Sequence, residues 1–239
     1  MSVRAVLLDV EGTTTPISFV TETLFPYARQ YGREFILNHL ADEEIRRALL
    51  QLRVDNDADR RDGAPAIEDD AHDAIESTIR YYFWLMDADR KSTALKTIQG
   101  RIWHDGYARG ELQSTIFPDV LPAMERWRQA GRVISIYSSG GVLAQQELFR
   151  YTVYGDLTPF INAYFDTQVG GKKQVDSYRK IAATLEMPVR EILFVSDSVA
   201  ELDAALMAGA MTAWSVRPGN PTFWERTAHP IIHSFEELP

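Results

Sequence analysis

The chain has 239 residues, of which 45% are hydrophobic and 25% charged, and its formal net charge is −9. This composition is typical of a soluble globular protein, long enough for one α/β domain with a sizeable insertion, and it argues against disorder. The acidic balance opposes nonspecific nucleic-acid binding, the lack of cysteine removes any disulfide, and no apolar run approaches the roughly 20 residues of a membrane span.

The first predicted element is a buried strand over residues 3–8, whose apolar residues barely alternate, as in a parallel sheet covered on both faces. Asp9 follows it, and Glu11 and Gly12 put a second carboxylate and a flexible turn at the strand's carboxyl end, where open α/β sheets bind ligands. Glu11 would point the same way as Asp9 if the strand continued. Asp9 is ionised at neutral pH, and carboxylates serve as nucleophiles in phosphoaspartyl chemistry. The simpler interpretation is an aspartate that begins a turn.

Residues 21–109 show helical spacing without a convincing buried strand, which predicts an inserted helical domain. The acidic stretch 55–63 is expected to interrupt its helices as a solvated connection, since it lacks the acid that a Ca²⁺ loop carries after its glycine. We place the junctions near Pro16 and Phe117. The prediction is a core domain of residues 1–15 and 117–239 and a helical cap domain of residues 16–116.

Helices and strands alternate after Phe117, which predicts a parallel, right-handed, doubly wound α/β sheet. The expected helices and strands are, in turn, 121–129, 133–137, 142–150, 164–165, 177–184, 192–195, 200–208 and 212–216.

Polar residues follow three more of these strands. Ser138 and Ser139 precede a helix, so their hydroxyls and the free N–H groups there could bind phosphate oxygens, although Ser-Ser-Gly is also a good helix cap. Lys172 could neutralise a phosphate and Asp9, although loop lysines are usually solvated. Asp197 could hold Mg²⁺ opposite Asp9, or cap a helix, and Glu201 comes four residues later. Four such residues at the same end of successive strands predict an active site.

At these positions the chain resembles the haloacid dehalogenase-like superfamily, whose signatures are D-x-[DE]-G-T, a terminal Ser or Thr, a Lys and an acidic metal loop. More narrowly, it is similar to the methionine-salvage enolase-phosphatases. The resemblance runs from about Ala5 to Asn220 and rests on D-V-E-G-T-T-T-P-I-S-F-V, F-P-D-V, Y-S-S-G-G, G-D-L-T-P-F-I-N-A-Y-F-D-T, K-x4-S-Y-R-K-I-A and R-P-G-N. It implies a Rossmann-like core with a helical cap.

The resemblance also implies a mechanism. Asp9 would attack phosphorus to form an aspartyl-phosphate, and Glu11 would protonate the leaving group and then activate water. One Mg²⁺ per chain would be held by Asp9, the main-chain carbonyl of Glu11 and Asp197. The phosphate would be bound by Lys172, Ser138 and Ser139.

The substrate implied by the resemblance is 2,3-diketo-5-methylthiopentyl-1-phosphate, which is enolised and then dephosphorylated in methionine salvage. A monomer is also implied, and a cytoplasmic protein is expected because no basic leader precedes the first apolar run. Two alternatives remain open. One is a phosphatase of the same superfamily acting on another small phosphate ester, and the other is a noncatalytic module that binds a phosphorylated metabolite.

Overall fold

The structure is a computed structural model, and it describes residues 2–68, 71–90, 92–220 and 227–239. The chain divides into two compact units, one made of Met1–Thr23 and Gly110–Pro239 and the other of Leu24–Arg109. The expected junctions lay near Pro16 and Phe117, whereas residues 16–23 and 110–116 group with the first unit.

The first unit is built on one parallel sheet. Its strands are β1 (Ala5–Leu8), β2 (Val133–Tyr137), β3 (Ala163–Phe165), β4 (Ile192–Ser196), β5 (Met211–Ser215) and β6 (Ile231–Ile232), arranged in the order β3-β2-β1-β4-β5-β6. The predicted parallel α/β sheet is therefore confirmed. The sequence did not predict β6, because two residues are too few to show a periodic pattern.

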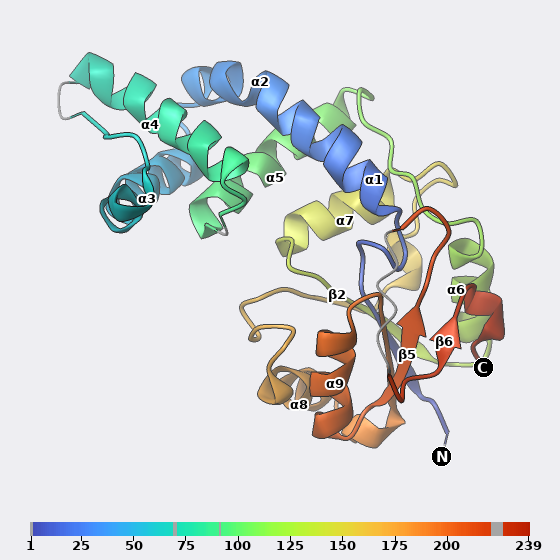
Figure 1. Cartoon of the computed structure of the whole chain (residues 1–239). Helices are drawn as coiled ribbons and strands as arrows, with labels where there is room; N and C mark the ends of the chain where they lie inside the picture. The colour runs from blue at the N-terminus through green and yellow to red at the C-terminus, as the bar shows by residue number, and fades with distance from the viewer. Residues whose placement is uncertain (1, 69–70, 91, 221–226) are drawn as a thin grey trace. The chain divides into compact units, whose positions relative to one another are not determined.

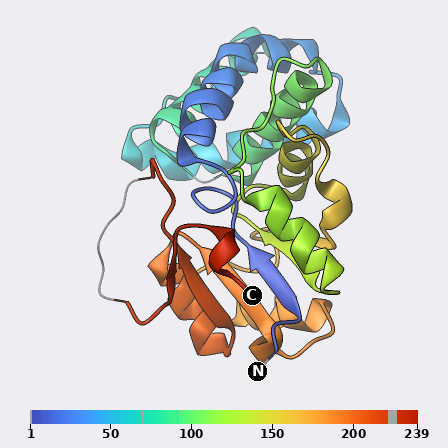
Figure 2. The ribbon, with the colours of Figure 1, turned by 90° about the vertical axis from the view of Figure 1, so that its right-hand side faces the viewer.

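Helices pack on both faces of this sheet, as Figure 1 shows. They are α6 (Val120–Gln129), α7 (Val142–Arg150), α8 (Val175–Thr184) and α9 (Val199–Ala208), with 3₁₀ turns η3 (Thr158–Phe160), η4 (Val189–Glu191) and η5 (Phe235–Glu237). Helices α8 and α9 lie on one face, and α6 and η5 lie together on the other (Figures 1 and 2). Each helix begins and ends within two residues of its expected position, because its apolar face follows the helical period.

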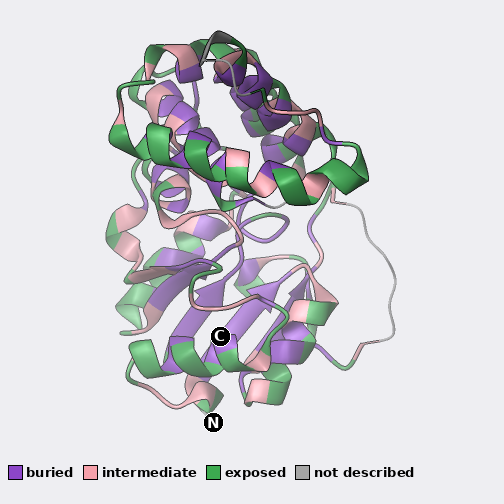
Figure 3. Ribbon diagram, turned by 90° about the vertical axis from the view of Figure 1, so that its left-hand side faces the viewer, coloured by how far each residue is buried: buried purple, intermediate pink, exposed green. Residues whose placement is uncertain are grey.

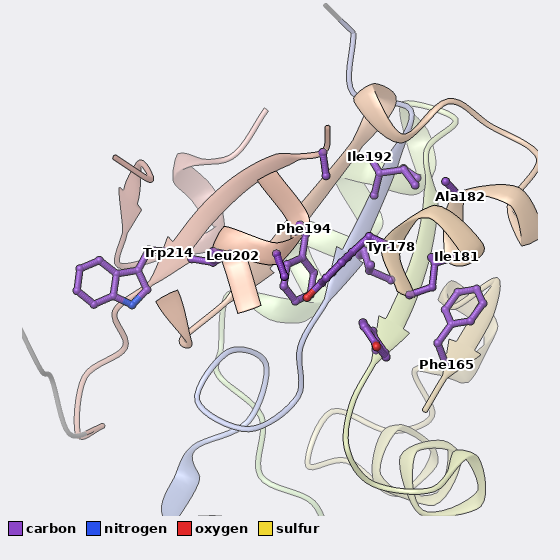
Figure 4. Close-up of a cluster of buried hydrophobic side chains, with 14 residues drawn as sticks. Phe165, Tyr178, Ile181, Ala182, Ile192, Phe194, Leu202 and Trp214 are labelled. Atoms are coloured by element: carbon purple, nitrogen blue, oxygen red, sulfur yellow. The ribbon is translucent and has the colours of Figure 1, made fainter. Parts of the chain in front are cut away.

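A hydrophobic core lies between the sheet and helices α8 and α9 (Figure 4). The four inner strands β1, β2, β4 and β5 are buried almost throughout, whereas the helices expose one side (Figure 3). The hydroxyl of Tyr178 and the indole N–H of Trp214 leave this core to bond the main-chain oxygens of Lys172 and Asp197, at 2.6 and 2.9 Å. Large aromatic residues thus fill the core and also hold two loops at the edge of the sheet.

The short helix α1 (Ile17–Phe19) and the π-helical turn η1 (Val20–Leu24) end the first segment of the sheet unit. The second unit is helical and contains α2 (Phe25–Asn38), α3 (Glu43–Asp59), the 3₁₀ turn η2 (Arg60–Asp62), α4 (Ala71–Asp87) and α5 (Thr93–Ala108). The expected break over residues 55–63 was wrong in its extent, since α3 continues to Asp59. The reason is that Asn56 is buried and donates a 2.9 Å hydrogen bond to the Pro65 carbonyl, which holds the end of the helix in the unit.

The interior of the helical unit is aromatic and closely packed. Tyr82 is fully buried, and its ring packs so closely on Gly32 that a Cβ there would lie 2.8 Å from it. Trp103 is buried and donates a 2.8 Å hydrogen bond to the Leu24 carbonyl. Across the ranges that the structure describes, no helix is both long and apolar enough for a membrane crossing.

Candidate active site

Asp9 and Asp197 directly follow two neighbouring strands. Leu8 pairs with Val195 in the register of β1 and β4, and the Asp9 N–H donates a 3.0 Å hydrogen bond to the Val195 carbonyl. In chain order, β1, β2 and β3 lie side by side toward one edge of the sheet. The next three strands, β4, β5 and β6, start beside β1 and continue toward the other edge. The order therefore reverses between β1 and β4. Open α/β sheets bind ligands at such a reversal, outside the carboxyl ends of the strands.

Lys172 is buried between two carboxylates. Its Nζ lies 2.6 Å from Asp9 Oδ1 and 2.6 Å from Glu201 Oε2, and the three side chains are only 7%, 6% and 13% exposed. Burial alone would lower the pKa of Lys172, but the charges of Asp9 and Glu201 outweigh it and raise this pKa above its usual value. Lys172 is therefore a permanent cation in contact with Asp9, and not a solvated loop residue.

Ser196 links the same two carboxylates. Its hydroxyl lies 3.0 Å from Asp9 Oδ2 and 3.1 Å from Glu201 Oε2, and it can donate its single hydrogen to only one of them at a time. No sequence pattern predicted a role for Ser196, and Glu201 was notable only for its position four residues after Asp197. The structure brings both to Asp9, because β4 lies next to β1 and Glu201 is in the first turn of α9.

Gly12 packs directly against the carboxylate of Asp197. A Cβ at Gly12 would lie 2.2 Å from Asp197 Oδ2, and Gly12 has a φ of +72°, so any other residue here would be strained and would displace the Asp197 carboxylate. Burial, with repulsion from Asp9 as the second cause, raises the pKa of Asp197 to about 7, although Lys172 opposes this shift. The same two causes raise the pKa of Glu201. The site therefore holds more negative charge than Lys172 alone can balance.

Glu11 lies in a turn and its side chain is exposed. Because β1 ends at Leu8, strand alternation does not orient Glu11, so the condition on which the sequence argument depended is not met. Glu11 is nevertheless close enough to Asp197 that its charge contributes to raising the pKa of Asp197.

Ser138 and Ser139 follow β2, the other neighbour of β1, at the same edge of the sheet. Ser138 is buried; its N–H donates to the Phe165 carbonyl at 3.1 Å, and its Oγ accepts from the Gly140 N–H at 3.1 Å. Gln145 steadies this turn by donating to the carbonyls of Gly140 and Phe165, at 2.7 and 3.0 Å. Ser139 is half-buried, and α7 begins at Val142.

The donor set fits a divalent cation. Asp9, Asp197 and Glu201 place three carboxyl groups near the single ammonium of Lys172, and repulsion from Asp9 contributes to raising the pKa of both Asp197 and Glu201, which a cation would relieve. Carboxylate and carbonyl oxygens are the ligands that Mg²⁺ prefers. Within the described part of the chain, no three His, Cys, Asp or Glu side chains form a metal-binding group. The expected ligand set does not require one, since it has two carboxylates and one main-chain carbonyl.

Comparisons with known proteins agree with one another. A family model for haloacid dehalogenase-like hydrolases matches residues 3–209. The enolase-phosphatase E1 of Synechococcus elongatus is 47% identical over 238 residues, covering 100% of this chain and 98% of the relative. That of Thioalkalivibrio sulfidiphilus is 42% identical over 232 residues, covering 97% of each.

Two solved structures are also similar to this chain. The crystal structure of the UTR4 protein of Saccharomyces cerevisiae has a TM-score of 0.79 at 31% identity and covers 99% of this chain and 100% of its own. CbbY from Rhodobacter sphaeroides, solved in complex with phosphate, has a TM-score of 0.57 at 20% identity, covers 99% and 96%, and shares the fold. This chain therefore belongs to the haloacid dehalogenase-like hydrolases and, within them, to the enolase-phosphatase E1 family.

Proposed function

We propose that this protein is an enolase-phosphatase that enolises 2,3-diketo-5-methylthiopentyl-1-phosphate and then removes its phosphate, as a step of methionine salvage. The observation that carries the proposal is the buried Asp9 carboxylate, which contacts Lys172 through one oxygen and Ser196 through the other at the point where the strand order reverses. The full-length identity to the enolase-phosphatases E1 supports this reaction against others on the same fold.

Asp9 is the nucleophile of this proposal. An oxygen of its carboxylate bonds to phosphorus while the ester P–O bond breaks, and water then hydrolyses the aspartyl-phosphate to release inorganic phosphate and restore Asp9. Lys172 supports this role, because a buried ammonium in contact with Asp9 offsets the repulsion between a carboxylate and a phosphate dianion. Ser138 and Ser139, at the end of the next strand, are proposed to hold phosphate oxygens and keep the reacting atoms in line.

Glu11 is proposed to protonate the departing alkoxide and later to take a proton from the attacking water. Its place in the turn after Asp9, with its charge acting on Asp197, supports a position beside the reacting phosphate. Its exposure on the surface of the sheet unit lets it exchange protons with solvent between the two steps.

Proteins of this family generally use Mg²⁺. In this chain we propose that the carboxylates of Asp9 and Asp197 and the main-chain carbonyl of Glu11 hold it. When bound, Mg²⁺ offsets the negative charge of the phosphate and of the enediolate. We further propose that Leu24–Arg109 is the cap domain. One Mg²⁺ per chain and a monomeric protein remain predictions.

The function is tested by incubating the protein and Mg²⁺ with the diketone phosphate, while ultraviolet absorbance follows enolisation and a phosphate assay follows release. We expect both signals, and phosphate release that stops when a chelator removes Mg²⁺. Release from other small phosphate esters at equal or higher kcat/KM, without enolisation of the diketone, would instead favour a general phosphatase. Binding of phosphate esters with no release from any of them would favour the noncatalytic module.

The Mg²⁺ ligand Asp197 is tested without turnover. Ligands that bind only the folded state stabilise it, by about 2.7 kcal/mol at one hundred times Kd, so Mg²⁺ should raise the Tm of the wild type. Asp197→Asn keeps the shape of the side chain but removes its charge, and we expect this variant to lose most of the Mg²⁺-dependent rise in Tm. Asp176→Asn, at a carboxylate whose side chain is 77% exposed on α8, is the control and should keep it. Equal Mg²⁺-dependent shifts in Asp197→Asn and the wild type would exclude Asp197 as a ligand.

A further inference from the structure

Two sequence motifs have no part in the proposed reaction. F-P-D-V spans residues 117–120 and R-P-G-N spans residues 217–220, about a hundred positions apart. The structure brings both motifs to the loop that follows Asp9, residues 10–17. This loop includes Glu11.

Three successive carbonyls of this loop accept hydrogen bonds from the two motifs. The Gly12 carbonyl accepts from Asn220 Nδ2 at 2.9 Å, and the Thr13 carbonyl accepts from Arg217 Nε at 3.1 Å. The Thr14 carbonyl accepts from the main-chain N–H of Phe117 at 3.0 Å. The side-chain oxygen of Asn220 also accepts a long, 3.4 Å bond from the Ile17 N–H, so one amide reaches both ends of the loop.

Arg217 is itself held rigidly. Its side chain is only 2% exposed, and Nη1 lies 2.6 Å from Asp119 Oδ2. The guanidinium carbon lies 4.8 Å from the ring centroid of Phe117 and 4.2 Å from that of Phe235, both within the range of cation–π contacts. A planar cation with an ion pair and two aromatic neighbours has few alternative positions, so the bond to Thr13 has a fixed origin.

The loop also touches the proposed metal ligand. A Cβ at Gly12 would lie 2.2 Å from Asp197 Oδ2 and 3.2 Å from Asn220 Nδ2, so the carboxylate and the amide both pack on the same side of Gly12. Because Asn220 also donates a hydrogen bond to the Gly12 carbonyl, it holds the residue that follows Glu11 against Asp197.

We propose that Asn220 and Arg217 are positioning residues. Together with Asp119 and Phe117 they form a clamp that holds the loop of residues 10–17 in the position, relative to Asp197, that Glu11 and its carbonyl need for the reaction. The predicted effect of the clamp on turnover rests on the proposed function. The predicted effect on the loop itself does not.

Asn220→Ala tests the clamp, with Asn162→Ala as the matched control. Asn162 also bonds a main-chain group through its amide, accepting from the Ile134 N–H at 2.9 Å near the start of β2, away from the strand ends of the site. In Asn220→Ala we expect faster hydrogen exchange at the amides of Thr13, Thr14 and Thr15, which bond the Val10 carbonyl in the intact loop. We also expect weaker Mg²⁺ binding by calorimetry and kcat lower by about 10–100-fold with KM near the wild-type value, because a displacement of about 1 Å can cost 10²-fold.

Asn162→Ala should leave loop hydrogen exchange, Mg²⁺ affinity and kcat unchanged, even if its Tm falls as far as that of Asn220→Ala. Unchanged hydrogen exchange over residues 10–17 in Asn220→Ala would overturn the clamp, and so would losses of kcat and Mg²⁺ affinity no larger than those in Asn162→Ala.

Arg217→Lys is a second variant, because lysine retains the charge beside Asp119 but cannot repeat the Nε bond to Thr13. Faster loop exchange in a folded Arg217→Lys protein supports the clamp, and wild-type exchange contradicts it. If the wild type itself released no phosphate, the proposed function would fail, and hydrogen exchange would still decide whether the clamp exists.

Discussion

Asp9→Asn is expected to abolish phosphate release, with a loss on the order of 10⁵-fold or more, as for other enzymes that lose their nucleophile. Asparagine matches the shape of aspartate, but its amide does not attack phosphorus. The fold should survive, because Lys172 keeps its 2.6 Å contact with Glu201, and the asparagine can keep its amide oxygen toward Lys172 while its NH2 donates to the Ser196 hydroxyl. The loss should therefore appear in kcat, with the far-ultraviolet circular dichroism of the variant unchanged.

Covalent trapping makes this prediction specific to the nucleophile. Acid quenching of the wild type during turnover should give a peptide that contains residue 9 and has gained the mass of one phosphoryl group. Asp9→Asn should show no such peptide, whereas Asp176→Asn, made and assayed in parallel, should show it at the wild-type level. A wild-type phosphoryl group found only on another residue, or turnover retained in Asp9→Asn, would refute the role of Asp9.

Lys172→Met is expected to lose both activity and stability. Methionine has about the length of lysine but no charge, so the variant leaves Asp9 and Glu201 buried without their cation. Breaking a buried ion pair by removing one partner costs about 3–5 kcal/mol of unfolding free energy. Phosphate release should fall at least 100-fold, since the charge that offsets carboxylate–phosphate repulsion is gone. Chemical denaturation and the phosphate assay measure the two effects.

The neighbouring lysine provides the control for this experiment. Lys173 is exposed, and Lys173→Met should change neither quantity appreciably. The double variant Lys172→Met/Glu201→Gln should regain part of the stability, because it removes one of the two uncompensated charges, but none of the activity. An equal loss of stability in Lys172→Met and Lys173→Met would contradict the buried ion pairs.

The effect of Lys172 on stability should depend on pH in one direction. The pKa of Lys172 is raised in the folded protein, so its contribution is fully present below the unfolded lysine pKa of about 10.4 and is lost as pH rises through the folded value. On the alkaline side, the difference in unfolding free energy between the wild type and Lys172→Met should therefore stay constant from about pH 9 to about pH 10.4 and narrow only at higher pH. A difference that already narrowed as the pH rose from about 8 to about 9 would contradict the ion pairs.

Local patterns in the sequence were enough to predict the main strands and the helices of the sheet unit. The strand Val133–Tyr137 and the helix Val142–Arg150 occur exactly where apolar spacing places them, because burial on a sheet or a helix face imposes a period that a single segment reveals. The same reasoning put Asp9, Ser138 and Asp197 at the carboxyl ends of strands. In a parallel sheet these ends all lie at one edge, so the residues were expected at the same edge. Acidic residues misled it at Asp57 and Asp59: Asp57 lies on the exposed side of a helix that tertiary contacts extend, and Asp59 accepts a 2.6 Å hydrogen bond from the Tyr81 hydroxyl inside the unit.

The sequence alone therefore determined the class of fold, the strand ends that carry chemistry and the family. Only the tertiary structure decided which partners these residues take: Glu201 beside Lys172, Ser196 beside Asp9, and Arg217 and Asn220 on the carbonyls of Thr13 and Gly12. The physical reason is that hydrophobic periodicity is a local signal averaged over many residues. A hydrogen bond or ion pair between residues 29 to 208 positions apart depends instead on the register of neighbouring strands and on a few ångströms of side-chain reach.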